Sequence, residues 1–214
     1  MKSAGESSTH SRMDFVAFDL ETTGIDSETD EILEIGAVKF SCFEPVDTFV
    51  TLVNPGRSIP LDAEMVHGIS DEMVQDAKGI KEVFGPFADF CGDLPMVAHN
   101  ARFDFKFLET AIKKHKGKAP TGVILDSFNL AKTVIRGLPN YKLETLILHF
   151  NFPSTVFHRA EADAAYCGMV FGKIIQVLEA GHHPTAIHDL LQLSEMKELR
   201  LPQVAQQSEQ LGLF

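Results

Sequence analysis

Two carboxylates stand two residues apart where an apolar segment ends. Phe15 to Phe18 is a run of apolar residues that predicts a buried strand, and Asp19 and Glu21 follow it. Side chains two residues apart on a strand point to the same face, so the two carboxylates lie side by side. Like charges in a buried setting need a cation between them. The pair is either the polar end of a strand or half of a metal site.

A third carboxylate lies on the apolar face of a predicted helix. Asp163 shares this face with residues that recur at steps of three or four, and no Lys or Arg follows within the helix before Lys173. A buried carboxylate needs a partner, so Asp163 favours a metal. The apolar positions are Ala160, Ala164, Cys167, Val170, Phe171, Ile174 and Leu178.

Other candidate residues are ambiguous when each is taken alone. Asp104 lies in the first turn of a predicted helix, where the helix macrodipole favours any negative charge. His99 and Asn100 end a short apolar strand and are either turn residues or part of a site. Glu34, inside a predicted strand, is expected to have a structural or supporting role. His67, before Gly68, reads by itself as a loop residue.

Taken together, these residues indicate phosphoryl-transfer chemistry. Four carboxylates in one cleft would repel one another strongly, and two divalent ions about 4 Å apart would resolve this. Carboxylate oxygens favour Mg²⁺ or Mn²⁺ over zinc. His158 stands five residues before Asp163, and a histidine of near-neutral pKa is suited to deprotonate an attacking water.

The elements that must position these residues predict an α/β fold. Residues 15–18, 32–40 and 46–53 are strand-like with short links, which indicates an antiparallel meander with a turn at Glu44-Pro45. Short strands at 95–100 and 123–126 then alternate with helices, which indicates parallel crossovers. The helices are expected at 79–91, after 100, at 127–135, at 141–149 with Asn140 as cap, and after 158.

Length and composition are those of one globular domain. The chain has 214 residues, is 44% hydrophobic and has no uninterrupted apolar run long enough to cross a membrane. Its net charge of -11 argues against broad binding to a nucleic-acid backbone. Three cysteines without paired spacing fit a reducing cytoplasm. Residues 1–12 are small and polar, and we expect a disordered leader there.

The motifs DLETTG at 19–24, VHGIS at 66–70, HNARFDFKFL at 99–108 and HRAEAD at 158–163 carry a family resemblance. In this order they resemble the DnaQ-like, or DEDDh, 3′–5′ exonucleases of the ribonuclease H-like superfamily. The resemblance implies a mixed five-stranded sheet, a three-strand antiparallel meander plus parallel strands, flanked by helices. The exonuclease domain is expected over residues 13–181.

The resemblance also implies roles for individual residues. Asp19, Glu21, Asp104 and Asp163 would bind two divalent cations, Mg²⁺ or Mn²⁺, and His158 would be the general base. Leu20, Thr22, Thr23 and Gly24 would approach the 3′-terminal nucleotide. His67, Asn100 and Phe103 would line or support the same pocket, which replaces the loop interpretation of His67.

The end of the chain resembles a second pattern. Residues 182–201 are expected to form a helical extension and 202–214 a flexible tail. Gln210, Leu211, Leu213 and Phe214 resemble the QLxLF peptide by which bacterial replication proteins dock on the sliding clamp. The proofreading subunit of the replicative polymerase continues past such a motif, whereas this chain ends there. We therefore expect a self-standing exonuclease recruited by the clamp.

The expected activity is metal-dependent release of nucleoside monophosphates from DNA 3′ ends, single-stranded ones first. Two alternatives stay open, an RNA-trimming exoribonuclease and a non-catalytic adaptor that holds the clamp. An intact set of buried acids argues against the adaptor. No membrane partner is expected.

Overall fold

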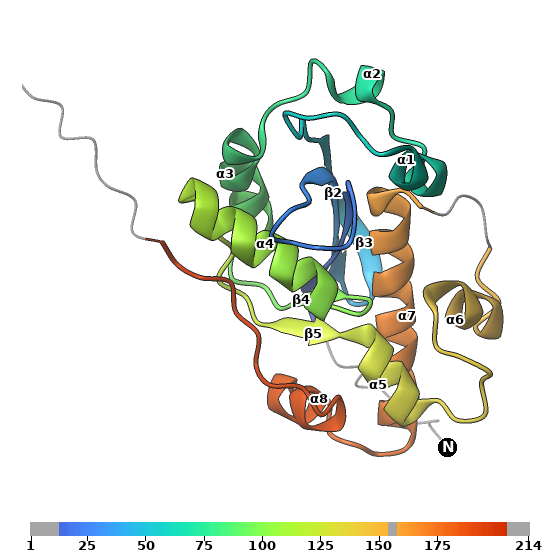
Figure 1. The fold of residues 1–214 in the computed structure, drawn as a ribbon. Helices are drawn as coiled ribbons and strands as arrows, with labels where there is room; N and C mark the ends of the chain where they lie inside the picture. Colours follow the sequence, from blue (N-terminus) through green and yellow to red (C-terminus); the bar gives the residue numbers. More distant parts are fainter. Residues whose placement is uncertain (1–12, 154–157, 205–214) are drawn as a thin grey trace, which may run out of the picture.

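The computed structural model describes residues 13–153 and 158–204. Five strands form one sheet in the order β3-β2-β1-β4-β5, with helices on both faces (Figure 1). The strands are β1 (Phe15–Thr22), β2 (Ile32–Ser41), β3 (Glu44–Leu52), β4 (Met96–Ala98) and β5 (Ile124–Asp126). The helices are α1 (Leu61–His67), α2 (Asp71–Val74), α3 (Ile80–Cys91), α4 (Arg102–His115), α5 (Ser127–Val134), α6 (Leu143–His149), α7 (Ala160–Ala180) and α8 (Ile187–Leu193).

The sheet is mixed, as predicted. Strands β1, β2 and β3 pair antiparallel, and β4 and β5 add parallel to β1. The register places Asp19 beside Gly36 and Glu21 beside Glu34. The carboxyl ends of β1, β4 and β5 lie at one edge because parallel strands end at the same side of a sheet. The mixed five-stranded architecture inferred from the sequence is confirmed.

Each face of the sheet has its own apolar core. The first core joins the sheet to α3 and α4, and the second joins it to α5 and α7 (Figure 1). Burying one such large side chain stabilises the fold by roughly 1.5–3 kcal/mol. Members of the first core include Phe18, Phe84, Phe87, Phe107 and Leu108, and members of the second include Phe15, Phe40, Leu130, Phe171 and Ile174.

Several predicted boundaries in the first 150 residues differ from the observed ones, and two of the differences are at turns. The turn expected at Glu44-Pro45 lies at Cys42 and Phe43, whose φ angles are 51° and 66°, and β3 already begins at Glu44. The helix expected from residue 141 begins at Leu143. Before it, the Asn140 side chain accepts the Lys142 N–H (3.0 Å), which closes a turn in place of a first helical turn.

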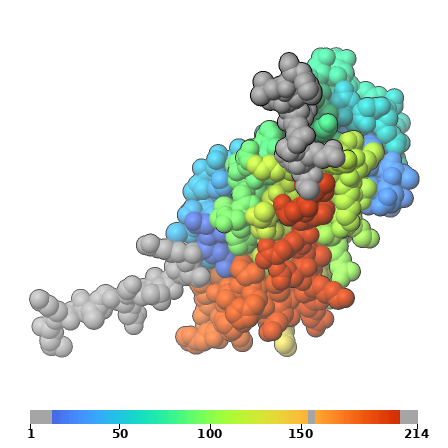
Figure 2. Space-filling model, turned by 90° about the vertical axis from the view of Figure 1, so that its left-hand side faces the viewer, coloured from blue at the N-terminus to red at the C-terminus, as the bar shows by residue number. Residues whose placement is uncertain are grey.

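The C-terminal extension is helical only over α8, so the prediction of a helix through residue 201 is wrong. Glu195 has a left-handed φ of 51°, and the chain then runs extended beside β5, the outermost strand of the sheet. The Ile124 N–H donates to the Leu199 carbonyl (2.9 Å), and Leu201 enters the first core. Figure 2 shows this segment, in red, on the surface of the domain. Burial of apolar residues against the domain replaces the helix.

Some predictions fall outside the described residues. These are the leader 1–12 and the tail residues Gln210, Leu211, Leu213 and Phe214. Among the helices that the structure describes, none has the length and apolar character to cross a bilayer.

Candidate active site

Three of the predicted acidic residues meet at the end of β1. Asp19, Glu21 and Asp163 each place a carboxylate oxygen within 4.8 Å of the others. Asp19 and Glu21 share the face of β1 that α7 covers, and Asp163 comes from the first turn of α7. The helix reaches the sheet closely because residue 36 is glycine: a Cβ there would lie 2.2 Å from the carbonyl carbon of Ala160. Three carboxylates this close together could hold a cation.

The fourth predicted acid, Asp104, lies beside this cluster. It belongs to the first turn of α4, is 3% exposed, and is not one of the three residues within 4.8 Å. Its charge nevertheless acts on Asp19, where it is the strongest of the neighbouring charges that raise the pKa. Two helices from opposite faces of the sheet therefore contribute acids to one edge.

Loss of hydration and mutual repulsion disfavour ionisation throughout the cluster. Burial, then Asp104 and Asp163, raise the pKa of Asp19 well above its ordinary value. Burial, followed by Asp163, raises the pKa of Glu21 to about 7. Burial raises the pKa of Asp104 to about 8, although backbone N–H groups oppose the shift. Burial also raises the pKa of Asp163. The acids repel one another unless cations or protons join them.

The metal-free protein is expected to lose stability as the pH rises from 6.5 to 8. A folded pKa of about 8 at Asp104 means that below pH 8 the folded state keeps a proton which the unfolded chain has lost, so the free energy of unfolding falls as the pH rises toward 8. The pKa of His99 is lowered to about 4 by burial. This shift makes the folded state more stable as the pH rises, but only below the ordinary histidine pKa of 6.5, so it does not act in this pH range. The expected loss is about 1–2 kcal/mol, or a fall in Tm of roughly 2–8 °C.

Thermal unfolding in EDTA across this pH range measures the effect. Asp104→Asn should reduce the pH dependence without abolishing it, because the amide does not titrate whereas Glu21, whose pKa is raised to about 7, still does. A Tm in EDTA that rises with pH in the unmodified protein would contradict the raised pKa values.

His158 stands at the mouth of the site. Its backbone has a left-handed φ of 63°, and its N–H donates to Asp163 Oδ2 (3.1 Å). The imidazole is exposed, with Nε2 3.9 Å from Glu144 Oε1. His158 and Asp163 line one small hollow with Lys142, Leu143 and Glu144. An exposed imidazole beside the acids can exchange protons with solvent and with a bound group.

The segment after Glu21 is held by its own side chains. Thr22 Oγ1 donates to the Gly24 carbonyl (2.6 Å), and Thr23 Oγ1 donates to Asp30 Oδ1 (3.0 Å). Both threonines are buried, and Leu20 packs in the first core at 5% exposure. The part of this motif with free surface is therefore the backbone around Gly24.

His67 is the last residue of α1, so it is helical where the pattern alone indicated a loop. Its Nδ1 accepts the Ile69 N–H (3.0 Å), so the ring proton is on Nε2. Burial lowers its pKa, partly opposed by the Thr22 carbonyl. Within the described residues, Nε2 makes no hydrogen bond of ordinary geometry. A neutral donor is thus held near the Thr22 turn.

Asn100 and Phe103 line a separate hollow of about 220 Å³ at the start of α4. Arg102 and Lys106 line the same hollow, and both are exposed. Asn100 has a left-handed φ of 67°, and its N–H donates to Asp126 Oδ1 (3.1 Å). The hollow combines an aromatic ring with two cations next to the turn that carries Asp104.

Asp126 is a functional candidate that the sequence interpretation missed. It ends β5, is 2% exposed, and also accepts the N–H of Phe128 (2.9 Å). Its charge raises the pKa of Asp104. The signal was available, because Asp126 follows a short apolar strand as Asp19 does. It carries the Asn100 turn and so the start of α4.

His99 connects the site to the chain before α6. Its Nδ1 lies 2.9 Å from Ser127 Oγ, and its Nε2 lies 2.9 Å from the Tyr141 carbonyl. Because a carbonyl only accepts, Nε2 carries the proton. Burial lowers its pKa to about 4. His99 is thus a neutral internal link, and its ring is committed to the protein on both sides.

A family model described as exonuclease (RNase_T) matches residues 16–171. The chain belongs to this exonuclease family. The match includes all the acids described above and His158. The resemblance inferred from the motifs is confirmed.

Two relatives with more than 35% sequence identity are named as DNA polymerase III proteins. The exonuclease domain is 40% identical over 175 residues to the PolC-type DNA polymerase III of Caldanaerobacter subterraneus subsp. tengcongensis, covering 82% of this chain and 12% of that one. It is 36% identical over 168 residues to the DNA polymerase III subunit epsilon of Treponema pallidum, covering 78% of each. The chain therefore spans about an eighth of the PolC-type relatives and most of the epsilon subunit.

A solved structure shares the fold. Exonuclease X, in complex with 5′ overhanging duplex DNA, superimposes with a TM-score of 0.65 at 23% identity, covering 84% of this chain and 99% of the other. This agreement supports the ribonuclease H-like architecture.

Proposed function

We propose that the protein is a metal-dependent 3′–5′ exonuclease that releases nucleoside monophosphates from DNA. The observation that carries the proposal is the convergence of Asp19, Glu21 and Asp163 within 4.8 Å, with Asp104 beside them. An adaptor without catalysis has no use for acids that repel one another. Membership of the exonuclease family supports the same conclusion.

The acidic residues suit two divalent cations. Asp19, Glu21, Asp104 and Asp163 supply only carboxylate oxygens, the donors that Mg²⁺ and Mn²⁺ prefer. Burial, and after it the charges of neighbouring acids, raise their pKa values, so a bound cation would favour the ionised carboxylates. When bound, such cations lower the pKa of a coordinated water and stabilise charge on the leaving oxygen.

His158 would take the proton from the attacking water. The backbone hydrogen bond to Asp163 fixes its main chain beside the acids, while the exposed ring can approach a bound nucleotide. A positioned histidine is suited to remove a proton from a bound water as general base.

The 3′-terminal nucleotide would lie against the Gly24 turn, and the buried ring of His67 would support this turn from beneath, near Thr22. Leu20, Thr22 and Thr23 would act through their backbone because their side chains are buried. Asn100 and Phe103 would support the next part of the strand. The positive charges of Arg102 and Lys106 suit its phosphates.

DNA is favoured as substrate because relatives at 35–40% identity are DNA polymerase III proteins. Such an enzyme would act in the cytoplasm. Incubating the purified chain with end-labelled single- and double-stranded DNA and RNA, with Mg²⁺ and with EDTA, tests the proposal. Faster degradation of RNA would establish the exoribonuclease instead. No degradation of any substrate, by a protein that still binds a clamp, would establish the adaptor.

Deleting Gln210 to Phe214 is expected to lower activity on clamp-loaded DNA and leave activity on short free oligonucleotides unchanged. Ordering a short tail costs about 1–2 kcal/mol per residue, and burying Leu211, Leu213 and Phe214 returns roughly 1.5–3 kcal/mol each. Binding of the isolated peptide should therefore be micromolar or weaker. Tethering at DNA ends would make such weak binding effective.

A labelled tail peptide and a bacterial sliding clamp provide the direct measurement. If the three apolar residues instead pack on the exonuclease domain, the deletion will lower the Tm without a clamp, and the peptide will not bind the clamp.

A further inference from the structure

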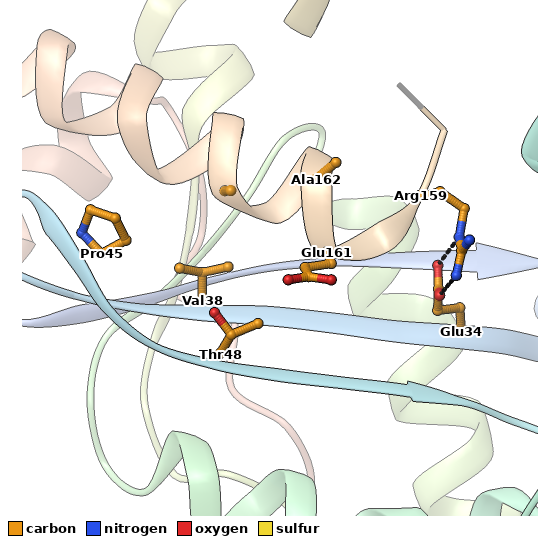
Figure 3. A pocket seen from close by; sticks show the side chains of 8 residues that line it. Glu34, Val38, Pro45, Thr48, Arg159, Glu161 and Ala162 are labelled. Atoms are coloured by element: carbon orange, nitrogen blue, oxygen red, sulfur yellow. Dashed lines mark hydrogen bonds and ion pairs between the residues drawn. The ribbon is translucent and has the colours of Figure 1, made fainter. Parts of the chain in front are cut away.

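Glu34 is a buried carboxylate beside the acidic cluster, and it is not one of the three residues that converge there. It is 1% exposed and lies next to Glu21 in the register of β1 and β2. Arg159 donates to both of its oxygens, from Nε at 3.1 Å and from Nη2 at 2.5 Å (Figure 3). The Ala160 N–H donates to Glu34 Oε2 as well (2.9 Å). Three donors thus occupy the carboxylate that stands nearest to the site along β2.

These contacts fix the start of α7 on the sheet. Arg159 is the N-cap of α7, and its carbonyl accepts the Asp163 N–H (3.0 Å). The residue before Arg159 is His158, whose own N–H returns to Asp163 Oδ2. The hydrogen bonds to Glu34 therefore fix Arg159, the one residue between His158 and the first turn of α7, which carries Asp163.

A second contact sets how deeply this turn sits. The backbone of Ala160 lies against Gly36, which pairs with Asp19 in the neighbouring strand. The carboxylate of Glu34 fixes the turn laterally, and Gly36 sets its distance from the sheet. Both residues of β2 are neighbours of ligands on β1, so an error in either contact would move Asp163 relative to Asp19 and Glu21.

We propose that Glu34 and Arg159 are positioning residues for the metal ligand Asp163 and the base His158. The inference rests on the proposed function and adds residues that do not themselves touch metal or substrate. A two-pronged contact between guanidinium and carboxylate fixes orientation as well as distance. Groups that orient ligands in this way commonly change metal affinity or activity by about 10–100-fold when altered.

Conservative substitutions separate the charge of the Glu34–Arg159 pair from its geometry. Arg159 borders a cavity of about 400 Å³ between α7 and strands β2 and β3 (Figure 3). Arg159→Lys keeps the positive charge and loses the two-pronged geometry. Glu34→Gln keeps an acceptor for the Ala160 N–H and loses the charge. The matched control is Lys114→Gln, which breaks an exposed ion pair between Lys114 and Glu31 (2.6 Å). Lys114 lies on α4, ten residues after Asp104.

The test measures kcat and KM on single-stranded DNA, and the Mn²⁺ concentration that half-saturates the rise in Tm. Both variants should lower kcat or Mn²⁺ affinity about 10–100-fold, with KM for DNA within about threefold of the unmodified protein. Excess Mn²⁺ should restore part of the activity, and Lys114→Gln should match the unmodified protein.

A lower Tm in EDTA with unchanged kcat and unchanged Mn²⁺ response would overturn the proposal and leave the pair a purely structural contact. If Glu34→Gln does not fold, Arg159→Lys decides by the same criteria. If the unmodified protein releases no nucleotide, the exonuclease proposal fails, and the Mn²⁺ response of the variants still tests the positioning of Asp163.

Discussion

Replacing Asp163 with asparagine is expected to abolish nucleotide release while the protein stays folded. The amide keeps an acceptor for the His158 N–H, so the local geometry survives. It loses the negative charge that would help hold the cations, and hydrolysis should fall by 10³-fold or more, to order of magnitude. Initial rates on labelled single-stranded DNA in Mg²⁺ measure this loss.

The same substitution should not destabilise the metal-free protein. Burial raises the pKa of Asp163, and its charge adds to the repulsion on Asp19 and Glu21. Removing that charge relieves repulsion, so the Tm in EDTA should stay equal or rise. Glu161→Gln is the matched control, because Glu161 is exposed, lies in the same helical turn and is outside the acidic cluster. This variant should keep the activity of the unmodified protein. Full activity of Asp163→Asn would contradict the assignment of a ligand.

His158→Ala is expected to slow the chemical step by about 10²–10⁴-fold, the usual contribution of a general base. The four acids are untouched, so Mn²⁺ should still raise the Tm. Activity should recover in part at high pH, where hydroxide replaces the base. Single-turnover rates between pH 6 and 10, compared with those of the unmodified protein, measure both effects.

A matched control for His158 is His149→Ala, which lies on α6 and is not among the residues lining the hollow of His158. It should retain the activity of the unmodified protein. Near-normal rates in His158→Ala at neutral pH would remove the general-base role. Loss of the Mn²⁺ response as severe as in Asp163→Asn would instead make His158 a metal ligand.

The fold was largely predictable because its periodicity is strong and local. Apolar runs separated by short turns indicated the meander, and the apolar spacing after residue 159 indicated α7. The prediction failed where contacts distant in sequence decide. Nothing in the local pattern of residues 194–201 shows that Leu199 will bridge to Ile124 or that Leu201 will enter the first core.

The residues of the candidate site also divide into those that the sequence indicated and those that only the structure reveals. Asp19 and Asp163 were identified because each places a charge in an apolar pattern. Arg159 was not, because nothing in the local sequence indicates its partner, and Asp126 was not, although it follows a short apolar strand as Asp19 does. Their importance comes from partners 125 and 26 residues away, Glu34 and Asn100, which only the folded chain brings together.

A metal-dependent exonuclease built on these acids would remove nucleotides from the 3′ end. The most direct measurement is the product pattern from one single-stranded DNA, labelled at its 5′ end in one reaction and at its 3′ end in another, with Mg²⁺ and with EDTA. We expect a ladder of shortening 5′-labelled strands, immediate release of labelled mononucleotide from the 3′ end, and neither product in EDTA or with Asp163→Asn. Equal degradation in EDTA, or mononucleotide release from the 5′ end first, would contradict this expectation.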